Sequence, residues 1–69
     1  MITVAENLKL KSQRILCGFT QETLAKAVGV SRQTIVSIEK GEGNPTLELC
    51  KRICKTLNTT LNDLFGEEQ

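Results

Sequence analysis

The sequence predicts a single all-α domain, and three observations support this prediction. The 69 residues are enough for one compact core and leave no room for a second. Apolar side chains recur at three- and four-residue spacing in several short segments, which is typical of helices that bury one face. Capping residues precede these segments, and glycines or turns follow them. We therefore expect four to five short helices, with a core over about residues 4–65 and a tail at 66–69.

The first two helices are expected on either side of Gly18. Thr3-Val4-Ala5-Glu6 has the form of a capping box, which predicts a helix over about residues 4–17. Thr20 then caps a second helix of barely two turns. This helix is expected to end at Gly29, because glycine readily adopts the left-handed conformation of a helix terminus.

The third helix is expected from Arg32 to about Lys40, with Ser31 as its cap and Gly41 after its end. Helical periodicity turns two of its apolar side chains, Ile35 and Ile38, toward the core. Most of its polar residues then fall elsewhere on the cylinder.

Two more helices are expected to close the domain. Thr46 follows the Asn44-Pro45 turn and caps a helix whose apolar positions have the spacing of a buried stripe. These positions are Leu47, Leu49, Cys50, Ile53, Cys54 and Leu57. Thr60-Leu61-Asn62-Asp63 is another capping-box pattern and begins a short last helix. Its apolar side chains are Leu61, Leu64 and Phe65.

Composition excludes several classes of function. The net charge of +1 favours no class of partner, because binding depends on local patches. The sequence contains no histidine, so it lacks the commonest general base and the usual zinc partner of cysteine. We therefore expect no enzyme, no metal and no cofactor. No segment has the pattern of a signal peptide or a membrane span, which indicates a cytoplasmic protein without membrane contact.

The three cysteines have two interpretations. Cys50 and Cys54 lie one helical turn apart and, with Cys17, could form a redox or soft-metal sensor built from thiolates. However, an odd number of cysteines is atypical of a disulfide framework, and two of them fall in the apolar stripe of the fourth helix. We favour reduced thiols that pack as small hydrophobic side chains.

The link between the second and third helices is the most informative part of the chain. Gly29-Val30-Ser31 is too short for antiparallel packing, so the two helices must cross steeply. Ala25 and Gly29 are small enough to allow close contact at this crossing. The crossing leaves the N-terminal half of the third helix projecting outward, in a geometry that fits the major groove of B-DNA.

These residues resemble the Cro and phage-repressor type of helix-turn-helix family, also called the xenobiotic-response-element type. The resemblance is contiguous over Thr20–Gly41, whose sequence is TQETLAKAVGVSRQTIVSIEKG. It extends through Asn44–Leu47 and Leu61–Phe65, and so covers most of residues 9–65. It implies a compact five-helix, lambda-repressor-like domain that binds double-stranded DNA with its third helix.

The resemblance also implies which side chains contact DNA. Gln21 matches a family glutamine that bonds a phosphate and braces the next helix, although it could be an ordinary exposed residue. Arg32 and Gln33 begin the recognition helix, and their side chains suit guanine and adenine edges; the alternative is that both are merely solvated. Further contacts are expected at six positions in or near this helix: Ser31, Thr34, Val36, Ser37, Lys40 and Asn44.

Three charged residues in or near these helices are not expected to contact DNA. Glu42 departs from the family pattern, because a carboxylate near phosphate is unfavourable, and we expect it to point away from DNA. Arg14 and Glu39 match positions that form a largely buried ion pair between the first and third helices of some phage repressors. The resemblance therefore implies a structural role for this pair.

The expected function is sequence-specific DNA binding by a transcriptional regulator, of the repressor type. Two copies would read a pseudo-palindromic operator with recognition helices about 34 Å apart. Candidate dimer surfaces are the last two helices, including Leu61 and Phe65, and Ile2-Thr3-Val4, unless these segments close the monomer core. The alternative is an antitoxin-like module that binds a protein partner and uses DNA binding for autoregulation.

Overall fold

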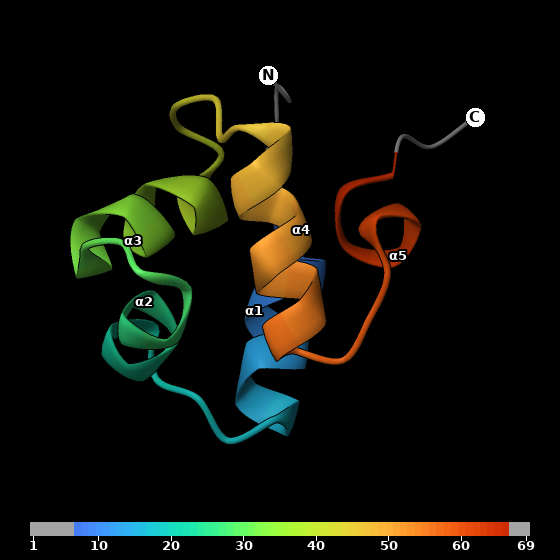
Figure 1. Cartoon of the computed structure of the whole chain (residues 1–69), viewed down its shortest axis with the longest axis horizontal. Coiled ribbons are helices and arrows are strands. Elements are labelled where there is room, and N and C mark those ends of the chain that lie inside the picture. The colour runs from blue at the N-terminus through green and yellow to red at the C-terminus, as the bar shows by residue number, and fades with distance from the viewer. Residues whose placement is uncertain (1–6, 67–69) are drawn as a thin grey trace.

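The computed structural model describes residues 7–66, and in that part of the chain it contains five α-helices and no strand. The helices are α1 (Leu8–Leu16), α2 (Gln21–Val28), α3 (Arg32–Lys40), α4 (Leu47–Thr56) and α5 (Leu61–Phe65). α4 runs through the middle of the molecule, with α2 and α3 on one side and α5 on the other (Figure 1). The predicted five-helix, all-α fold is confirmed. None of the described helices is long and apolar enough to cross a membrane.

Hydroxyl side chains cap four of the five helices, as predicted. In each case the cap oxygen accepts the backbone N–H of the residue three positions later, which satisfies one of the free N–H groups of the first turn. The cap residues are Thr20, Ser31, Thr46 and Thr60. At α2 the cap is reciprocal, because the Thr23 hydroxyl also accepts the backbone N–H of Thr20 at 2.8 Å.

The predicted start of α1 is wrong. The helix begins at Leu8, because Asn7 lies outside the helical region at φ −112° and its Oδ1 accepts the N–H of Leu10. Further hydrogen bonds tie Asn7 to α3 and α5, so the rest of the fold holds this cap in place. The capping-box pattern at residues 3–6 lies outside the described residues.

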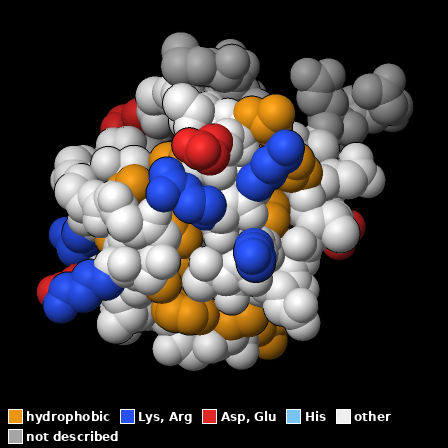
Figure 2. All heavy atoms as spheres, in the orientation of Figure 1, with side chains coloured by type: hydrophobic (Ala, Val, Ile, Leu, Met, Phe, Trp, Pro, Cys, Tyr) orange, Lys and Arg blue, Asp and Glu red, His pale blue; other side chains and the backbone are white. Residues whose placement is uncertain are grey.

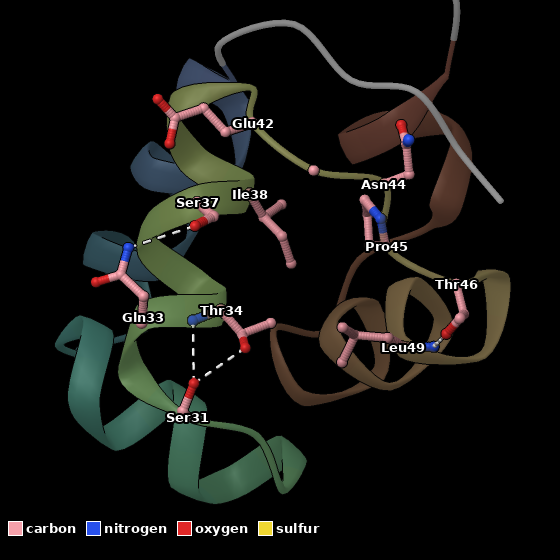
Figure 3. A pocket seen from close by; sticks show the side chains of 11 residues that line it. Ser31, Gln33, Thr34, Ser37, Ile38, Glu42, Asn44, Pro45, Thr46 and Leu49 are labelled. Carbon is pink, nitrogen blue, oxygen red and sulfur yellow. Dashed lines mark hydrogen bonds between the residues drawn. The ribbon is translucent and has the colours of Figure 1, made fainter.

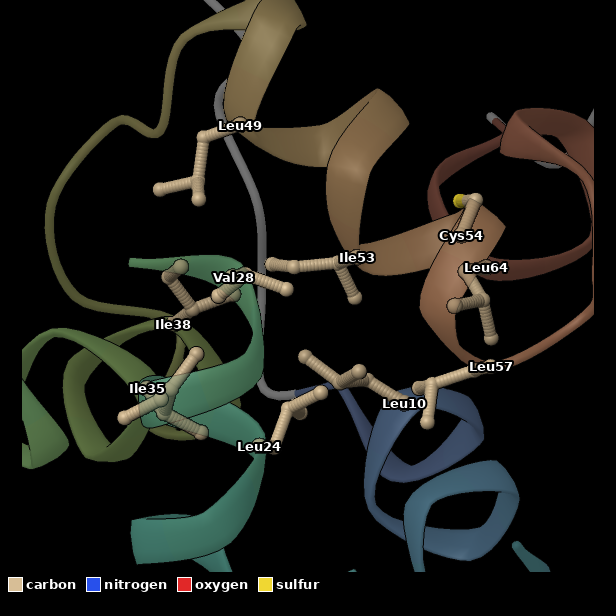
Figure 4. Packing of buried hydrophobic residues seen from close by; sticks show 11 residues of the cluster. Leu10, Leu24, Val28, Ile35, Ile38, Leu49, Ile53, Cys54, Leu57 and Leu64 are labelled. Atoms are coloured by element: carbon tan, nitrogen blue, oxygen red, sulfur yellow. The ribbon is translucent and has the colours of Figure 1, made fainter. Parts of the chain in front are cut away.

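Residues from all five helices form one hydrophobic core around α4 (Figure 4). Its completely buried side chains come from four different helices. They are Leu10 of α1, Leu24 of α2, Ile35 of α3, and Cys50 and Ile53 of α4, joined by Leu57 at the end of α4. The predicted inward positions of α3 and the later turns of the α4 stripe are confirmed.

The first position of the predicted α4 stripe is wrong. Leu47 is 48% exposed, whereas the later members of the stripe are buried. It is the first residue of α4 and therefore lies beyond the end of the cluster that the later turns form. Helical periodicity predicts which way a side chain points, but not whether another element covers it.

Gly29→Ala is expected to destabilise the domain by about 1–2 kcal/mol, because Gly29 has φ +80° and an L side chain is strained there. Steric conflict contributes little, since an added Cβ would meet only the Arg52 guanidinium, at 3.9 Å. The melting temperature should fall by about 4–8 °C for each kcal/mol, measured by circular dichroism. Lys55→Ala, on the exposed face of α4, serves as the control. Equal melting temperatures for the two variants would contradict the prediction.

Candidate nucleic-acid interface

The crossing of α2 and α3 exposes the beginning of α3. The three-residue link between the helices turns the chain sharply, and α3 lies across the end of α2 (Figure 1). Ala25 and Val28 of α2 are buried with Ile35 and Ile38 of α3, so the inner surfaces of both helices are occupied by packing. The side chains of Ser31, Arg32 and Gln33, at the start of α3, are exposed. The predicted geometry of this pair of helices is therefore present.

Four of the proposed contact residues share the outer face of α3. Gln33, Val36, Ser37 and Lys40 are spaced three and four residues apart, which places them on one side of a helix. Gln33 and Lys40 are exposed, and the other two are half-buried. The Gln33 Nε2 atom donates to the Ser37 Oγ atom at 3.4 Å (Figure 3). This face thus combines an amide, a hydroxyl, methyl groups and an ammonium group, all of which can bind base edges or phosphates.

A groove runs beside α3, between this helix, the following loop and the start of α4 (Figure 3). Five of the predicted contact residues line it: Ser31, Gln33, Thr34, Ser37 and Asn44. Apolar side chains of Ile38, Pro45 and Leu49 also line it. Thr46 and Glu42 line the groove as well, and no motif in the sequence predicted a groove at this place.

A chain of hydrogen bonds links the start of α3 to the interior. The Arg32 Nη2 atom donates to Gln21 Oε1 at 3.2 Å, and Gln21 Nε2 donates to Glu39 Oε1 at 3.1 Å. The Glu39 carboxylate can only accept hydrogen bonds, so the NH₂ group of Gln21 must point toward Glu39. The amide oxygen of Gln21 then accepts from Arg32. The second N–H of Nε2 remains for another acceptor, such as a phosphate. Gln21 therefore links α2 to both the start and the C-terminal part of α3.

The chain ends at a buried ion pair. Arg14 Nε lies 2.6 Å from Glu39 Oε2, and the two side chains are 9% and 6% exposed. A second guanidinium nitrogen, Arg14 Nη1, donates to the carbonyl of Phe19 at 2.9 Å. No buried side-chain nitrogen or oxygen atom among residues 7–66 lacks a partner. This pair, which the resemblance implies, joins α1 to the C-terminal part of α3.

The charges near the outer face of α3 are few. Arg32 and Lys40 are exposed cations, while Lys26 of α2 lies 3.8 Å from Glu22 in an exposed pair. Glu42 is also exposed and lines the groove. Its carboxylate points away from Asn44, to the side of α3 on which the Gln33 amide lies (Figure 3). This orientation does not favour the expectation that Glu42 turns away from DNA, which stays a prediction.

The cysteines differ in environment. Cys50 and Cys54 are buried, Cys17 is exposed, and all three are free thiols. Burial, together with nearby Cys50 and Asp63, raises the pKa of Cys54 to about 11, and burial also raises the pKa of Cys50. Among the described residues, no group of three or more potential ligand side chains could hold a metal ion. The environment of Cys50 and Cys54 is that of packing residues.

Iodoacetamide at pH 8 is expected to modify Cys17 much faster than Cys50 or Cys54. The thiolate is the reactive form, and a pKa of about 11 leaves about one thiolate in a thousand at Cys54 at this pH. Burial also blocks access of the reagent. Mass spectrometry of timed samples measures the three rates, with the urea-unfolded protein as the control in which all three should react. Equal rates in the native protein would contradict the packing role.

The fold and this interface define a helix-turn-helix protein. The helix-turn-helix family model matches residues 10–64, and the chain belongs to this family, in its Cro and phage-repressor type.

The similarity extends to individual proteins. The chain is 51% identical over 57 residues to an uncharacterized HTH-type transcriptional regulator of Methanocaldococcus jannaschii, covering 83% of this chain and 86% of that protein. It is 43% identical over 61 residues to the uncharacterized regulator YgzD of Bacillus subtilis, covering 88% and 92%. The structure of the restriction-modification controller protein C.AhdI from Aeromonas hydrophila matches with a TM-score of 0.76 and 30% identity, covering 83% of both chains.

Proposed function

We propose that this protein is a transcriptional regulator that binds double-stranded DNA by placing α3 in the major groove. The observation that carries the proposal is the outer face of α3. It gathers Gln33, Ser37 and Lys40 on the helix that follows the family's short interhelical turn, and the groove lined by Thr34, Asn44 and others lies beside it. Membership of the helix-turn-helix family supports the same function. An α-helix with its side chains is about 10–12 Å in diameter, which suits a groove about 12 Å wide.

In this mechanism the base contacts and the phosphate contacts have different roles. Arg32 and Gln33, at the start of α3, read base edges, and Val36 offers methyl groups to thymine. Thr34 and Ser37 add hydroxyl contacts from the same helix and its groove. Base contacts of this kind supply the selection among sequences.

Phosphate contacts position the protein on the duplex. Gln21 and Ser31 donate from the N-terminal ends of α2 and α3, and Lys40 and Asn44 donate from the other end of α3 and the following loop. The free N–H of the Gln21 amide supports its assignment, since its partner Glu39 occupies only one of the two amide hydrogens.

We further propose that the protein acts as a homodimeric repressor on a pseudo-palindromic operator. The protomer is 31 Å in its longest dimension, so two copies side by side can place their recognition helices about 34 Å apart. Leu61 and Phe65 are half-buried against the core, which leaves part of each available to a partner. The other candidate segment, Ile2-Thr3-Val4, lies outside the described residues.

Selection from a pool of random-sequence duplexes, followed by sequencing of the bound fraction, tests this function. We expect enrichment of a pseudo-palindrome whose half-sites are about one helical turn apart. An Arg32→Ala, Gln33→Ala double variant should remain folded and lose this enrichment. Lys51→Ala, an exposed residue of α4, serves as the matched control and should keep it. Failure of the folded wild-type protein to enrich any sequence would favour the antitoxin-like alternative with a protein partner.

A further inference from the structure

Glu42 directly follows the glycine that ends α3, and its backbone is hydrogen-bonded to this helix. Its backbone N–H donates to the carbonyl of Ser37 at 2.8 Å, and Gly41 before it has φ +80°, the left-handed conformation that ends helices. The Glu42 side chain is exposed, and within residues 7–66 its carboxylate takes part in no hydrogen bond or ion pair. The end of α3 therefore fixes the backbone of Glu42, and no described partner neutralises its carboxylate.

The location is electrostatically unfavourable for a carboxylate in the free protein. The C-terminal end of a helix carries partial negative charge, and an acidic side chain there is repelled. Local stability thus gives no reason for an acidic residue at this position. Its side chain also points to the same side of α3 as the Gln33 amide (Figure 3), so it faces the surface proposed to meet DNA.

When the start of α3 lies against base edges, its other end reaches the wall of the groove. Lys40 and Asn44 are the proposed phosphate contacts at this end, and Glu42 lies between them in the chain, so its carboxylate approaches the phosphates as well. The cations of Arg32 and Lys40 attract the phosphate backbone of the DNA. A carboxylate next to that backbone opposes part of the attraction.

We propose that Glu42 limits sequence-independent binding by repelling the DNA backbone, so that occupancy depends on base contacts. This inference rests on the proposed function. Electrostatic attraction to phosphates supplies essentially all of the non-specific affinity of DNA-binding proteins. A protein with few cations at its interface and one opposing carboxylate therefore dissociates readily from duplexes that lack matching bases.

The test is the affinity of Glu42→Gln for a labelled 30-base-pair random-sequence duplex, measured by fluorescence anisotropy at low salt. We expect binding about three- to ten-fold tighter than that of the wild type. The gain should shrink at high salt, because ions screen the interaction of exposed charges. The control is Asp63→Asn, an exposed residue of α5 that gives the same change in net charge, and it should bind as the wild type does.

Two results would overturn the inference while leaving the proposed function intact. One is equal affinity of Glu42→Gln and Asp63→Asn for the random duplex. The other is that Glu42→Gln changes the affinity for the selected operator but not for the random duplex. Glu42 would then act through contacts with bases. Failure of the wild type to bind any duplex would refute the proposed function itself, and the inference with it. Melting curves of both variants establish that each is folded.

Discussion

Glu39→Ala is expected to lower the free energy of unfolding by about 3–5 kcal/mol, because it leaves a buried guanidinium without its counter-charge. Arg14 is 7% exposed, and two of its nitrogens bond to Glu39, so water cannot replace the lost carboxylate without opening the core. Gln21 loses its acceptor in the same variant. For a domain of 69 residues the melting temperature should fall by at least about 12 °C.

Thermal unfolding followed by circular dichroism measures this effect against a matched surface pair. Glu22→Ala breaks the exposed pair with Lys26, whose side chains are 65% and 77% exposed, and should change stability by less than about 1 kcal/mol. An Arg14→Met, Glu39→Met double variant should recover much of the loss, because apolar side chains often replace a buried ion pair without cost. If Glu39→Ala and Glu22→Ala had the same melting temperature, the ion pair would have no structural role.

Arg32→Ala is expected to weaken operator binding by about 1–3 kcal/mol for each protomer and to relax selection at one base position of each half-site. The guanidinium is exposed at the start of α3 and is held by Gln21 at 3.2 Å, so it is oriented before DNA arrives. A preorganised side chain loses less entropy when it binds. In a dimer the two losses add, which makes this the largest expected effect on recognition.

Selection and sequencing with the Arg32→Ala protein, together with affinities for the operator and for random duplexes, measure this prediction. Lys51→Ala also removes one positive charge, from an exposed position of α4, and should leave the base preference unchanged. An Arg32→Ala protein that kept the wild-type preference at every base position would show that this arginine does not read the operator.

The elements that sequence analysis located correctly depend on interactions between near neighbours. Each hydroxyl cap bonds to the backbone three residues later, and Gly29 and Gly41 supply left-handed backbone at the residue that follows a helix. Both partners of such an interaction lie in one short segment. The boundaries of α2 to α5 and the inward positions of α3 could therefore be predicted without knowledge of the fold.

The candidate site could be predicted only in part. The outer face of α3 follows from helical spacing, and the individual contact roles came from the family resemblance. The groove could not be derived in this way, because its wall is the loop around Asn44 and Pro45, whose path depends on the packing of α4. Glu42 was expected to point away from DNA. The direction of its side chain depends on where α3 ends relative to the following loop, which only the tertiary structure describes.

By itself, the sequence determined the boundaries of α2 to α5 and most of the inward positions, because hydrogen bonds and periodicity within one segment specify them. Tertiary structure alone decided where α1 begins, since Asn7 is held by the carbonyl of Leu64 at 2.8 Å and that of Glu39 at 3.0 Å. It also decided how Gln21 connects the buried ion pair to Arg32. These partners lie far apart along the chain, and they meet only because the packing of all five helices brings them together.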